Sequence, residues 1–257
     1  MKEKLYTIPM LDALRAEDEC PFCYIERNLE EHALDFVIGP EATYMQDDVR
    51  AETDKIGFCK EHLHKMFTYG NPLASALILD THLKALSAEM KKEMKNYSGA
   101  AKTGLMDRLR GGASGTVDSN SLSKWIHDGE KSCYVCNHIK NNYDRYVATF
   151  LILFKRGDTE FMELLKKGKG FCLSHLADIM DAAPQYLNEK EQKQLREIVF
   201  PQIEASMERL LEELDWFEKK FDYRYKDEDW KTSRDVVQRA MQKIAGGYPA
   251  DEPYRQK

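Results

Sequence analysis

Residues 20–23 read Cys-Pro-Phe-Cys, and residues 57–63 read Gly-Phe-Cys-Lys-Glu-His-Leu. The pattern returns as Cys-Tyr-Val-Cys at residues 133–136 and as Gly-Phe-Cys-Leu-Ser-His-Leu at residues 170–176. These four segments contain all six cysteines of the chain. One offset of 113 relates both parts of the pattern, because 133 − 20 and 170 − 57 are each 113. The chain therefore carries one Cys-x-x-Cys…Cys-x-x-His unit twice.

The ligand types in this unit are those of a tetrahedral zinc site, which takes thiolate sulfur and imidazole nitrogen. Residues at i and i+3 are neighbours on a helix surface, so each half of the unit presents two ligands together. Helix starts also favour an anionic sulfur through their unpaired N–H groups. We therefore expect one zinc ion within each copy, two per chain. The first copy would supply Cys20, Cys23, Cys59 and His62, and the second copy would supply Cys133, Cys136, Cys172 and His175.

Other uses of the same thiols stay open at this point. Thiolates also suit an iron–sulfur cluster with one histidine ligand. Without metal, the cysteines would be buried small side chains or reducible disulfides. In a redox- or metal-responsive sensor, oxidation of thiols at helix starts would release the ion. Because four ligands are offered twice and no cysteine is left over, the pattern favours two closed zinc sites.

Apolar residues around the ligands recur at helical spacing. The offset of 113 also relates two apolar quartets near the ends of the copies, and this extends the repeat to most of the chain. The quartets are Leu86, Met90, Met94 and Tyr97, and Val199, Ile203, Met207 and Leu210. The sequence therefore predicts an all-α fold of two tandem pseudo-symmetric helical repeats, each closed by a Cys3His metal site.

The domain organisation follows from this repeat. Residues 1–97 would form the first zinc-binding repeat, and residues 98–121 a flexible linker rich in glycine and serine. Residues 122–257 would form the second repeat with a C-terminal extension. The extension contains a helix from about Ser233 to Ala245, which ends at a Gly-Gly pair. We expect its apolar face to consist of Val237, Ala240, Met241 and Ile244.

Length and composition are those of a soluble globular protein. The chain has 257 residues, of which 42% are hydrophobic and 32% are charged. It contains no apolar run long enough to cross a bilayer, and its first residues do not resemble a signal peptide. We therefore expect a cytoplasmic protein without membrane contact. In that compartment, cysteine pairs are ligands more often than disulfides.

The charge of the chain argues against nucleic acid as a partner. The formal net charge is −6, whereas binding to a duplex requires a strongly basic face. A local basic patch from Lys91 to Arg110 keeps nucleic-acid binding as a further alternative. Its cations are Lys91, Lys92, Lys95, Lys102, Arg108 and Arg110.

No catalytic residues can be assigned from the sequence. Neither of the common glycine-rich phosphate-binding loops is present. A catalytic zinc ion usually has three protein ligands and one open position, whereas each unit here supplies four ligands. The sequence therefore leaves enzymatic activity undecided, with the balance against it.

The two motif pairs together resemble a family of uncharacterised bacterial proteins, a domain of unknown function with a duplicated Cys-x-x-Cys/Cys-x-x-His helical unit. The resemblance covers the chain from about Cys20 to the final helix. It implies a metal-binding helical protein and supplies no activity. The function that the sequence favours is a zinc-binding module for protein interaction, scaffolding or regulation, with an unidentified protein partner.

Overall fold

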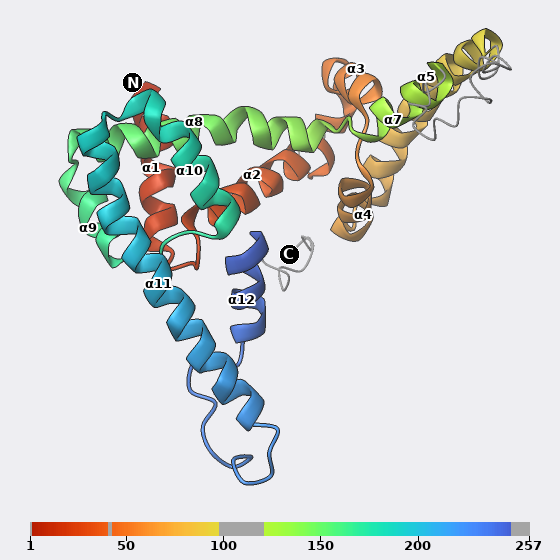
Figure 1. Ribbon diagram of the computed structural model, residues 1–257. Coiled ribbons are helices and arrows are strands. Elements are labelled where there is room, and N and C mark those ends of the chain that lie inside the picture. The colour runs from red at the N-terminus through yellow and green to blue at the C-terminus, as the bar shows by residue number, and fades with distance from the viewer. Residues whose placement is uncertain (1, 41–42, 98–120, 248–257) are drawn as a thin grey trace, which may run out of the picture. The chain divides into compact units, whose positions relative to one another are not determined.

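A computed structural model describes residues 2–40, 43–97 and 121–247 (Figure 1). Over these ranges the chain forms eleven α-helices, one short 3-10 helix and no strand. The predicted all-α class is therefore confirmed. The elements are α1 (Lys2–Arg15), α2 (Pro21–Ile38), η1 (Thr43–Met45), α3 (Asp47–Ile56), α4 (Lys60–Tyr69), α5 (Pro72–Asn96), α7 (Ser121–Glu130), α8 (Tyr134–Arg156), α9 (Thr159–Lys167), α10 (Leu173–Tyr186), α11 (Glu189–Lys219) and α12 (Val236–Ala245).

Two of the sequence predictions fall largely outside the described residues. Residues 98–120 of the predicted linker are among those not described, and so are Lys102, Arg108 and Arg110 of the basic patch. The remaining three lysines of that patch are exposed on α5.

None of the described helices combines the length and the apolar character that crossing a membrane requires.

The described residues divide into two compact units. Those of Met1–Glu31 and Ile139–Glu252 form unit 1, and those of His32–His138 form unit 2. The divisions fall inside α2 and α8, so each unit combines segments from both copies of the sequence repeat. Along the chain, the helix starts still follow the repeat, since α2 and α8, like α4 and α10, begin 113 residues apart.

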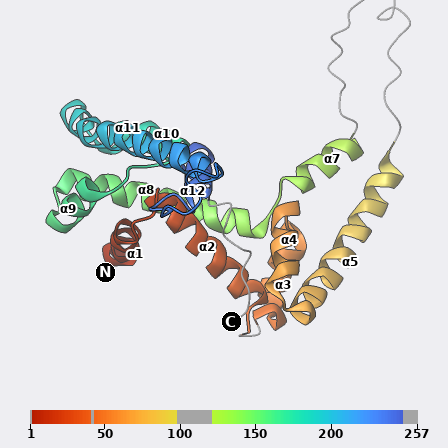
Figure 2. The ribbon, with the colours of Figure 1, turned by 90° about the horizontal axis from the view of Figure 1, so that it is seen from below.

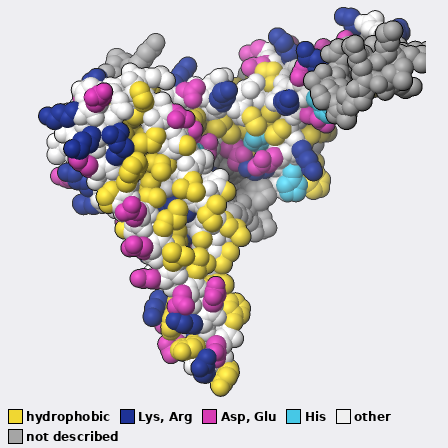
Figure 3. All heavy atoms as spheres, viewed as in Figure 1, with side chains coloured by type: hydrophobic (Ala, Val, Ile, Leu, Met, Phe, Trp, Pro, Cys, Tyr) yellow, Lys and Arg dark blue, Asp and Glu magenta, His cyan; other side chains and the backbone are white. Residues whose placement is uncertain are grey.

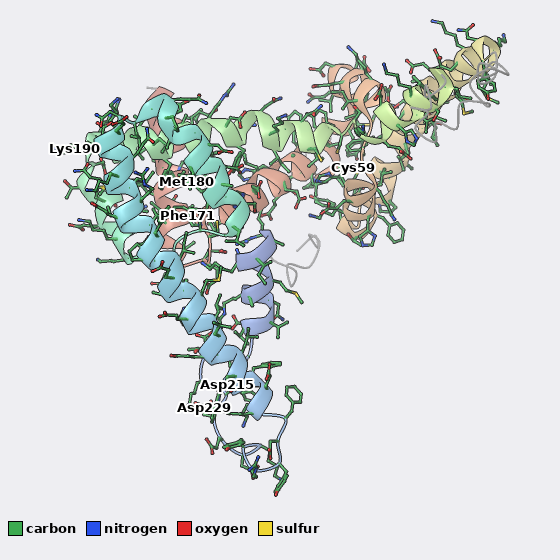
Figure 4. All side chains as sticks on the ribbon, in the orientation of Figure 1. Cys59, Phe171, Met180, Lys190, Asp215 and Asp229 are labelled. Atoms are coloured by element: carbon green, nitrogen blue, oxygen red, sulfur yellow. The ribbon has the colours of Figure 1, made fainter. Side chains whose placement is uncertain are left out.

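Four phenylalanines form the centre of unit 1, and all are almost completely buried. The ring of Phe150 in α8 lies 5.1 Å from that of Phe161 in α9, centroid to centroid. It lies 5.5 Å from Phe171, the residue labelled ahead of α10 in Figure 4, and 5.7 Å from Phe22 in α2. These edge-on contacts are favourable for aromatic pairs. They join the first turn of α2 to α8, α9 and the start of α10.

Helix α12 packs beside α10 and α11, and it buries both apolar and polar side chains (Figure 1). Gln242 and Lys243 are buried, whereas Met241 and Ile244 are 48% and 63% exposed. The prediction that Met241 and Ile244 belong to the packed face is therefore wrong. The Nζ atom of Lys243 donates to the carbonyl oxygens of Glu19 and Lys169, at 2.7 and 2.9 Å. These hydrogen bonds turn the side of α12 that carries Lys243 inward, and Met241 and Ile244 therefore face outward. Figure 3 shows hydrophobic side chains gathered on the surface over α10, α11 and α12.

The carboxylate of Glu19 lies at the centre of a cluster of cations in unit 1. Its side chain is 1% exposed, and both of its oxygens lie 2.7 Å from Nη2 of Arg209 in α11. Arg239 and Lys243 of α12 add contacts at 3.4 and 3.5 Å. A buried carboxylate is tolerated only when it is paired in this way. Since Glu19 directly precedes Cys20, the cluster fixes the start of α2 against α11 and α12.

In unit 2, helices α3 and α4 lie against the first half of α5 (Figure 2). Asn71 caps α5 by accepting from the amide of Ala74 at 3.2 Å, and its own amide donates to the carbonyl of Ile38 at 2.9 Å. Ala74 and Ile78 are buried on this side of α5. From Leu83 onward, no described residue of α5 is buried. The outer half of α5 therefore presents apolar side chains on its surface.

Candidate metal centres

The eight predicted ligands come together in two groups of four, with their partners exchanged between the copies. In each group, the ligand atoms lie within 4.8 Å of one another. The prediction of one site within each copy is therefore wrong, because each Cys-x-x-Cys is paired with the Cys-x-x-His of the other copy. Site A, in unit 1, contains Cys20, Cys23, Cys172 and His175, and site B, in unit 2, contains Cys59, His62, Cys133 and Cys136.

Helix length explains the exchange. Helix α2 has 18 residues and is about 27 Å long, with its Cys-x-x-Cys at the beginning. The chain continues to Cys59 from the far end of that helix. Helix α8, with 23 residues and a length of about 34 Å, likewise begins at the second Cys-x-x-Cys. The Cys-x-x-Cys and the Cys-x-x-His are separated by the same number of residues in both copies. The sequence pattern therefore does not show which Cys-x-x-Cys shares a site with which Cys-x-x-His.

Every ligand lies at the start of a helix. Cys59 and Cys172 are the N-cap residues of α4 and α10, with nearly equal backbone angles (φ −72° and −70°, ψ 165° and 166°). Their histidine partners lie three residues later in the same first turns. Cys20 and Cys133 directly precede α2 and α8 in the same manner. Each site thus joins two helix starts, where N–H groups and the helix dipole stabilise negative charge. Figure 4 labels Cys59 at the start of α4.

Two glycines allow the chain to turn into these helices. Gly57 and Gly170, each two residues before a ligand cysteine, have φ values of +69° and +78°. A Cβ at Gly57 would lie 2.8 Å from the ring of His82, and one at Gly170 would lie 2.9 Å from Cγ1 of Ile203. The chain turns sharply at both positions, and only glycine fits there without strain.

In site A, the Nδ1 atom of His175 faces the three sulfurs. It lies 3.1 Å from Sγ of Cys172, 3.3 Å from that of Cys20 and 3.5 Å from that of Cys23. The sulfurs of Cys23 and Cys172 are 3.7 Å apart. The other ring nitrogen, Nε2, lies 3.1 Å from a carboxylate oxygen of Glu26. A carboxylate on the outer nitrogen is the usual way to orient a metal-binding histidine.

Site B repeats this geometry in unit 2. The Nδ1 atom of His62 lies 3.1 Å from Sγ of Cys59, 3.3 Å from that of Cys133 and 3.4 Å from that of Cys136. The sulfurs of Cys59 and Cys136 are 3.9 Å apart. The amide of Tyr134 donates to the carbonyl of Gly57 at 2.9 Å, which ties the start of α8 to the turn before α4.

These distances fit a single tetrahedral ion. With Zn–S bonds of about 2.3 Å, tetrahedral geometry places two sulfurs about 3.7–3.8 Å apart and a sulfur and a nitrogen about 3.5 Å apart. The S···S distances of 3.7 and 3.9 Å match the first value, and the S···N distances of 3.1–3.5 Å approach the second. A disulfide needs about 2.05 Å between its sulfurs, and all six cysteines are free. Both sites can therefore hold one metal ion each.

The thiols within one site differ in how readily they ionise. Burial and then the thiols of Cys172 and Cys23 raise the pKa of Cys20, whereas hydrogen bonds from Cys20 and Cys23 lower that of Cys172. In site B, burial opposes ionisation of Cys133, but the hydrogen bond with His62 lowers its pKa to about 6. Three thiolates can be charged together only where a cation offsets their repulsion, and a divalent metal ion does this.

The two sites differ in their contact with solvent. All four ligands of site A are buried, whereas Cys59 of site B is half-buried and Cys136 is exposed. The chain also covers site A with Gly246, where a Cβ would lie 3.6 Å from Sγ of Cys172 and 3.9 Å from that of Cys23. Site A is therefore the more enclosed of the two.

Glu26 and Gly246 are site residues that sequence reasoning missed. Glu26 follows Cys23 by three residues on α2, so helical spacing alone could have indicated it as a neighbour of the ligands. The offset of 113 places Ile139 at the corresponding position of the second copy, which breaks the repeat at this point. Nothing in the sequence connects Gly246 with a site 74 residues earlier (246 − 172).

A protein-family model matches nearly the whole chain. A family model described as a family of unknown function (DUF6062) matches residues 1–251. No curated protein and no solved structure matches the chain.

Proposed function

The chain belongs to this family of unknown function, so its function has to be inferred from its own sites, and we propose that it is a zinc protein with two structural Cys3His centres. The observation that carries the proposal is the convergence of three thiols and one imidazole at two helix starts, in each of two sites, at the distances that one ion requires. Zinc supplies no redox chemistry in such a site and acts as a cross-link between helices.

The short distances between the ligand atoms of each site favour a zinc ion over an iron–sulfur cluster. In a cluster, the protein ligands bind different iron atoms and are correspondingly spread apart. Here the ligand atoms of each site lie within 4.8 Å of one another, which is the span of ligands on one ion. A single iron ion with the same four ligands would be detected in the metal analysis described below.

A structural role is favoured over a catalytic one because four protein ligands complete a tetrahedral shell. A catalytic zinc ion needs an open position for water or substrate. Binding of a structural zinc ion contributes about 10 kcal/mol or more to folding in small zinc domains. Each ion would here join the starts of two helices, α2 with α10 at site A and α4 with α8 at site B.

We further propose that this zinc-stabilised scaffold binds another protein. Support comes from large apolar side chains that remain exposed on well-formed helices, such as Leu83 and Met90 of α5 and Ile244 of α12. Contiguous exposed apolar surface on a folded domain commonly marks an interaction site. Within each unit, the metal ion would hold in place the helices on which the unit is built.

The direct test is metal content. Protein purified without chelator should contain two zinc ions per chain when measured by inductively coupled plasma mass spectrometry. Removal of the metal with EDTA should reduce the helical signal in circular dichroism, and added zinc should restore it. A content well below one zinc per chain would overturn the proposal, and a visible absorption band from iron would replace zinc with iron.

A second candidate function is a redox-responsive release of metal from site B. The observation that favours it is the exposure of Cys136, 3.9 Å from the sulfur of Cys59, within an otherwise complete ligand group. Hydrogen peroxide would take two electrons from two thiolates, which would form a disulfide and release the ion, while the peroxide and two protons give two waters.

This candidate predicts stepwise release. With one equivalent of peroxide, a zinc-sensitive dye should report about one zinc per chain, and mass spectrometry should find the disulfide among Cys59, Cys133 and Cys136. Dithiothreitol should reverse the change. Equal release from both sites, or loss of zinc without a disulfide, would rule it out.

A further inference from the structure

An apolar groove lies beside site B in unit 2, with a volume of about 560 Å³. Its walls are α5, α7, the end of α3 and the segment that leads into the first turn of α4. The large apolar side chains that line it from the two helices are Leu79, Leu83, Leu86 and Met90 of α5, and Trp125 and Ile126 of α7.

The apolar lining of α5 forms one continuous face. Its four residues are spaced by four, three and four positions, which places them on the same side of the helix. Leu83 is 59% exposed, Met90 is 41% exposed, and Ile126 on α7 is 45% exposed. Side chains of this kind, exposed together around a concavity, lose free energy when a partner covers them. Methionine adapts well to the shape of such a partner.

The rim of the groove is acidic. Its described lining includes the four carboxylates of Asp54, Glu89, Asp128 and Glu130, and the single lysine Lys55. The Oδ1 atom of Asp54 is buried and has no hydrogen-bond partner among the described residues. Because that atom is inaccessible, the charge that a ligand would meet is that of the exposed carboxylates Glu89, Asp128 and Glu130. The charge of the groove thus complements a basic ligand.

From these features we infer that the groove binds a basic amphipathic helix of a partner protein. The lining from Leu79 to Met90 spans 11 residue steps of 1.5 Å, about 16 Å, which corresponds to three helical turns. Such a helix would place apolar residues at positions i, i+3 or i+4, and i+7 into the groove. Its lysine or arginine side chains would meet the acidic rim. The inference deepens the interaction role proposed above and rests on it.

Site B supports one wall of the groove. Phe58 and Leu63 both line it, and they directly adjoin the ligands Cys59 and His62 in the sequence. The ring of Phe58 packs 6.4 Å from that of Tyr134, centroid to centroid, at the start of α8. An ion at site B would hold the starts of α4 and α8 together and so keep this wall in place.

The test uses the metal-loaded full-length chain and two fluorescein-labelled peptides of 14 residues. One peptide has a helical pattern of leucine and lysine, and the other has the same pattern with glutamate in place of lysine. Fluorescence anisotropy should show binding of the leucine–lysine peptide and at least about tenfold weaker binding of the glutamate peptide. Absence of binding by the basic peptide, or equal binding of both, would overturn the inference.

Two pairs of variants locate the binding. Leu83→Ser should weaken binding of the basic peptide about tenfold, whereas Leu73→Ser, which changes a 63% exposed leucine outside the groove lining, should change it less than twofold. Glu89→Gln combined with Glu130→Gln should weaken it about tenfold at low salt. Glu204→Gln combined with Glu208→Gln, which removes the same charge from exposed positions on α11, should not. Equal effects within either pair would mean non-specific attraction and would overturn the inference.

Two further outcomes separate this inference from its alternatives. Sedimentation velocity of the wild-type chain should give a monomer. A dimer that Leu83→Ser dissociates would identify a second copy as the occupant and overturn the inference. Metal content is measured on the same samples: two zinc ions without peptide binding would remove only the groove proposal, and peptide binding by a chain that never contains zinc would remove only the metal proposal.

Discussion

The sulfur of Cys23 lies 3.7 Å from the sulfur of Cys172, although 149 positions separate the two residues in the chain. Cys59 and Cys136 approach in the same way across 77 positions. Each contact joins a Cys-x-x-Cys of one sequence copy to the Cys-x-x-His of the other. The two ligand groups are therefore built from a duplicated unit whose halves have been combined crosswise.

Paired cysteine substitutions distinguish the crossed arrangement from one site per copy. Cys20→Ser combined with Cys172→Ser changes site A alone, so that variant should retain about one zinc per chain. Cys20→Ser combined with Cys59→Ser changes both sites and should retain none or nearly none, because three ligands hold a structural zinc poorly. Metal analysis after gel filtration measures the difference. About one zinc in the variant with Cys20→Ser and Cys59→Ser, and none in the variant with Cys20→Ser and Cys172→Ser, would mean that each copy forms its own site.

Cys136 should be the first cysteine to react with an electrophile. It is exposed, whereas the three cysteines of site A are buried. With the metal-loaded protein, N-ethylmaleimide should modify Cys136 on the order of tenfold faster than Cys20, because reaction requires access to the sulfur. Mass spectrometry of peptides from a time course measures both rates. Cys136→Ser should leave the slow rate of Cys20 unchanged, and comparable rates in the wild type would contradict the difference in enclosure.

Gly246→Val should destabilise site A more than the same change at its neighbour. Gly246 and Gly247 both have positive φ, so valine at either position costs about 1–2 kcal/mol in backbone strain. Only at Gly246 would the new side chain meet site A, since a Cβ there lies 3.2 Å from Oγ of Ser174, and one at Gly247 has nothing within 4 Å. Zinc transfer to a chelating dye should therefore accelerate for Gly246→Val and not for Gly247→Val.

Glu19→Gln should lower the free energy of unfolding by about 3–5 kcal/mol, because it leaves the buried Lys243 and two partly buried arginines without their counter-charge. The two arginines are Arg209 and Arg239, which are the closest cations to its carboxylate. As a control, Asp215→Asn removes a carboxylate from an exposed ion pair with Lys219 and should cost less than about 1 kcal/mol. Urea denaturation of the metal-loaded proteins compares the two. Similar costs would mean that the Glu19 cluster contributes no more than a surface pair.

The sequence was sufficient to predict the fold class and the eight residues that gather in the structure. Helical spacing is visible in the chain because it repeats every 3.6 residues, and a Cys-x-x-Cys or Cys-x-x-His brings its two ligands together within one helical turn. These are local relationships. The positive φ of Gly57 and Gly170 is a local feature of the same kind, since each glycine lies shortly before a helix start.

The pairing of the sites was not predictable, because it depends on which helix starts meet in space. Equal spacings in the two copies fit either combination, and only the lengths of α2 and α8 separate them. The packed face of α12 was also mispredicted. Its apolar residues Met241 and Ile244 lie outside, since Lys243 is held by the carbonyl of Glu19, more than 200 positions earlier in the chain. The spacing of hydrophobic residues along a helix does not indicate a polar partner that is so distant in the sequence.

The crossed ligand groups are nested along the chain: the outer one, between Cys20 and His175, encloses the inner one, between Cys59 and Cys136. During synthesis, the inner group is therefore complete once residue 136 has left the ribosome, while the outer group must wait for residue 175. A chain cut between residues 97 and 121 would leave each fragment with half of both groups. Neither fragment could then close a metal site alone, and only their reassociation would restore both.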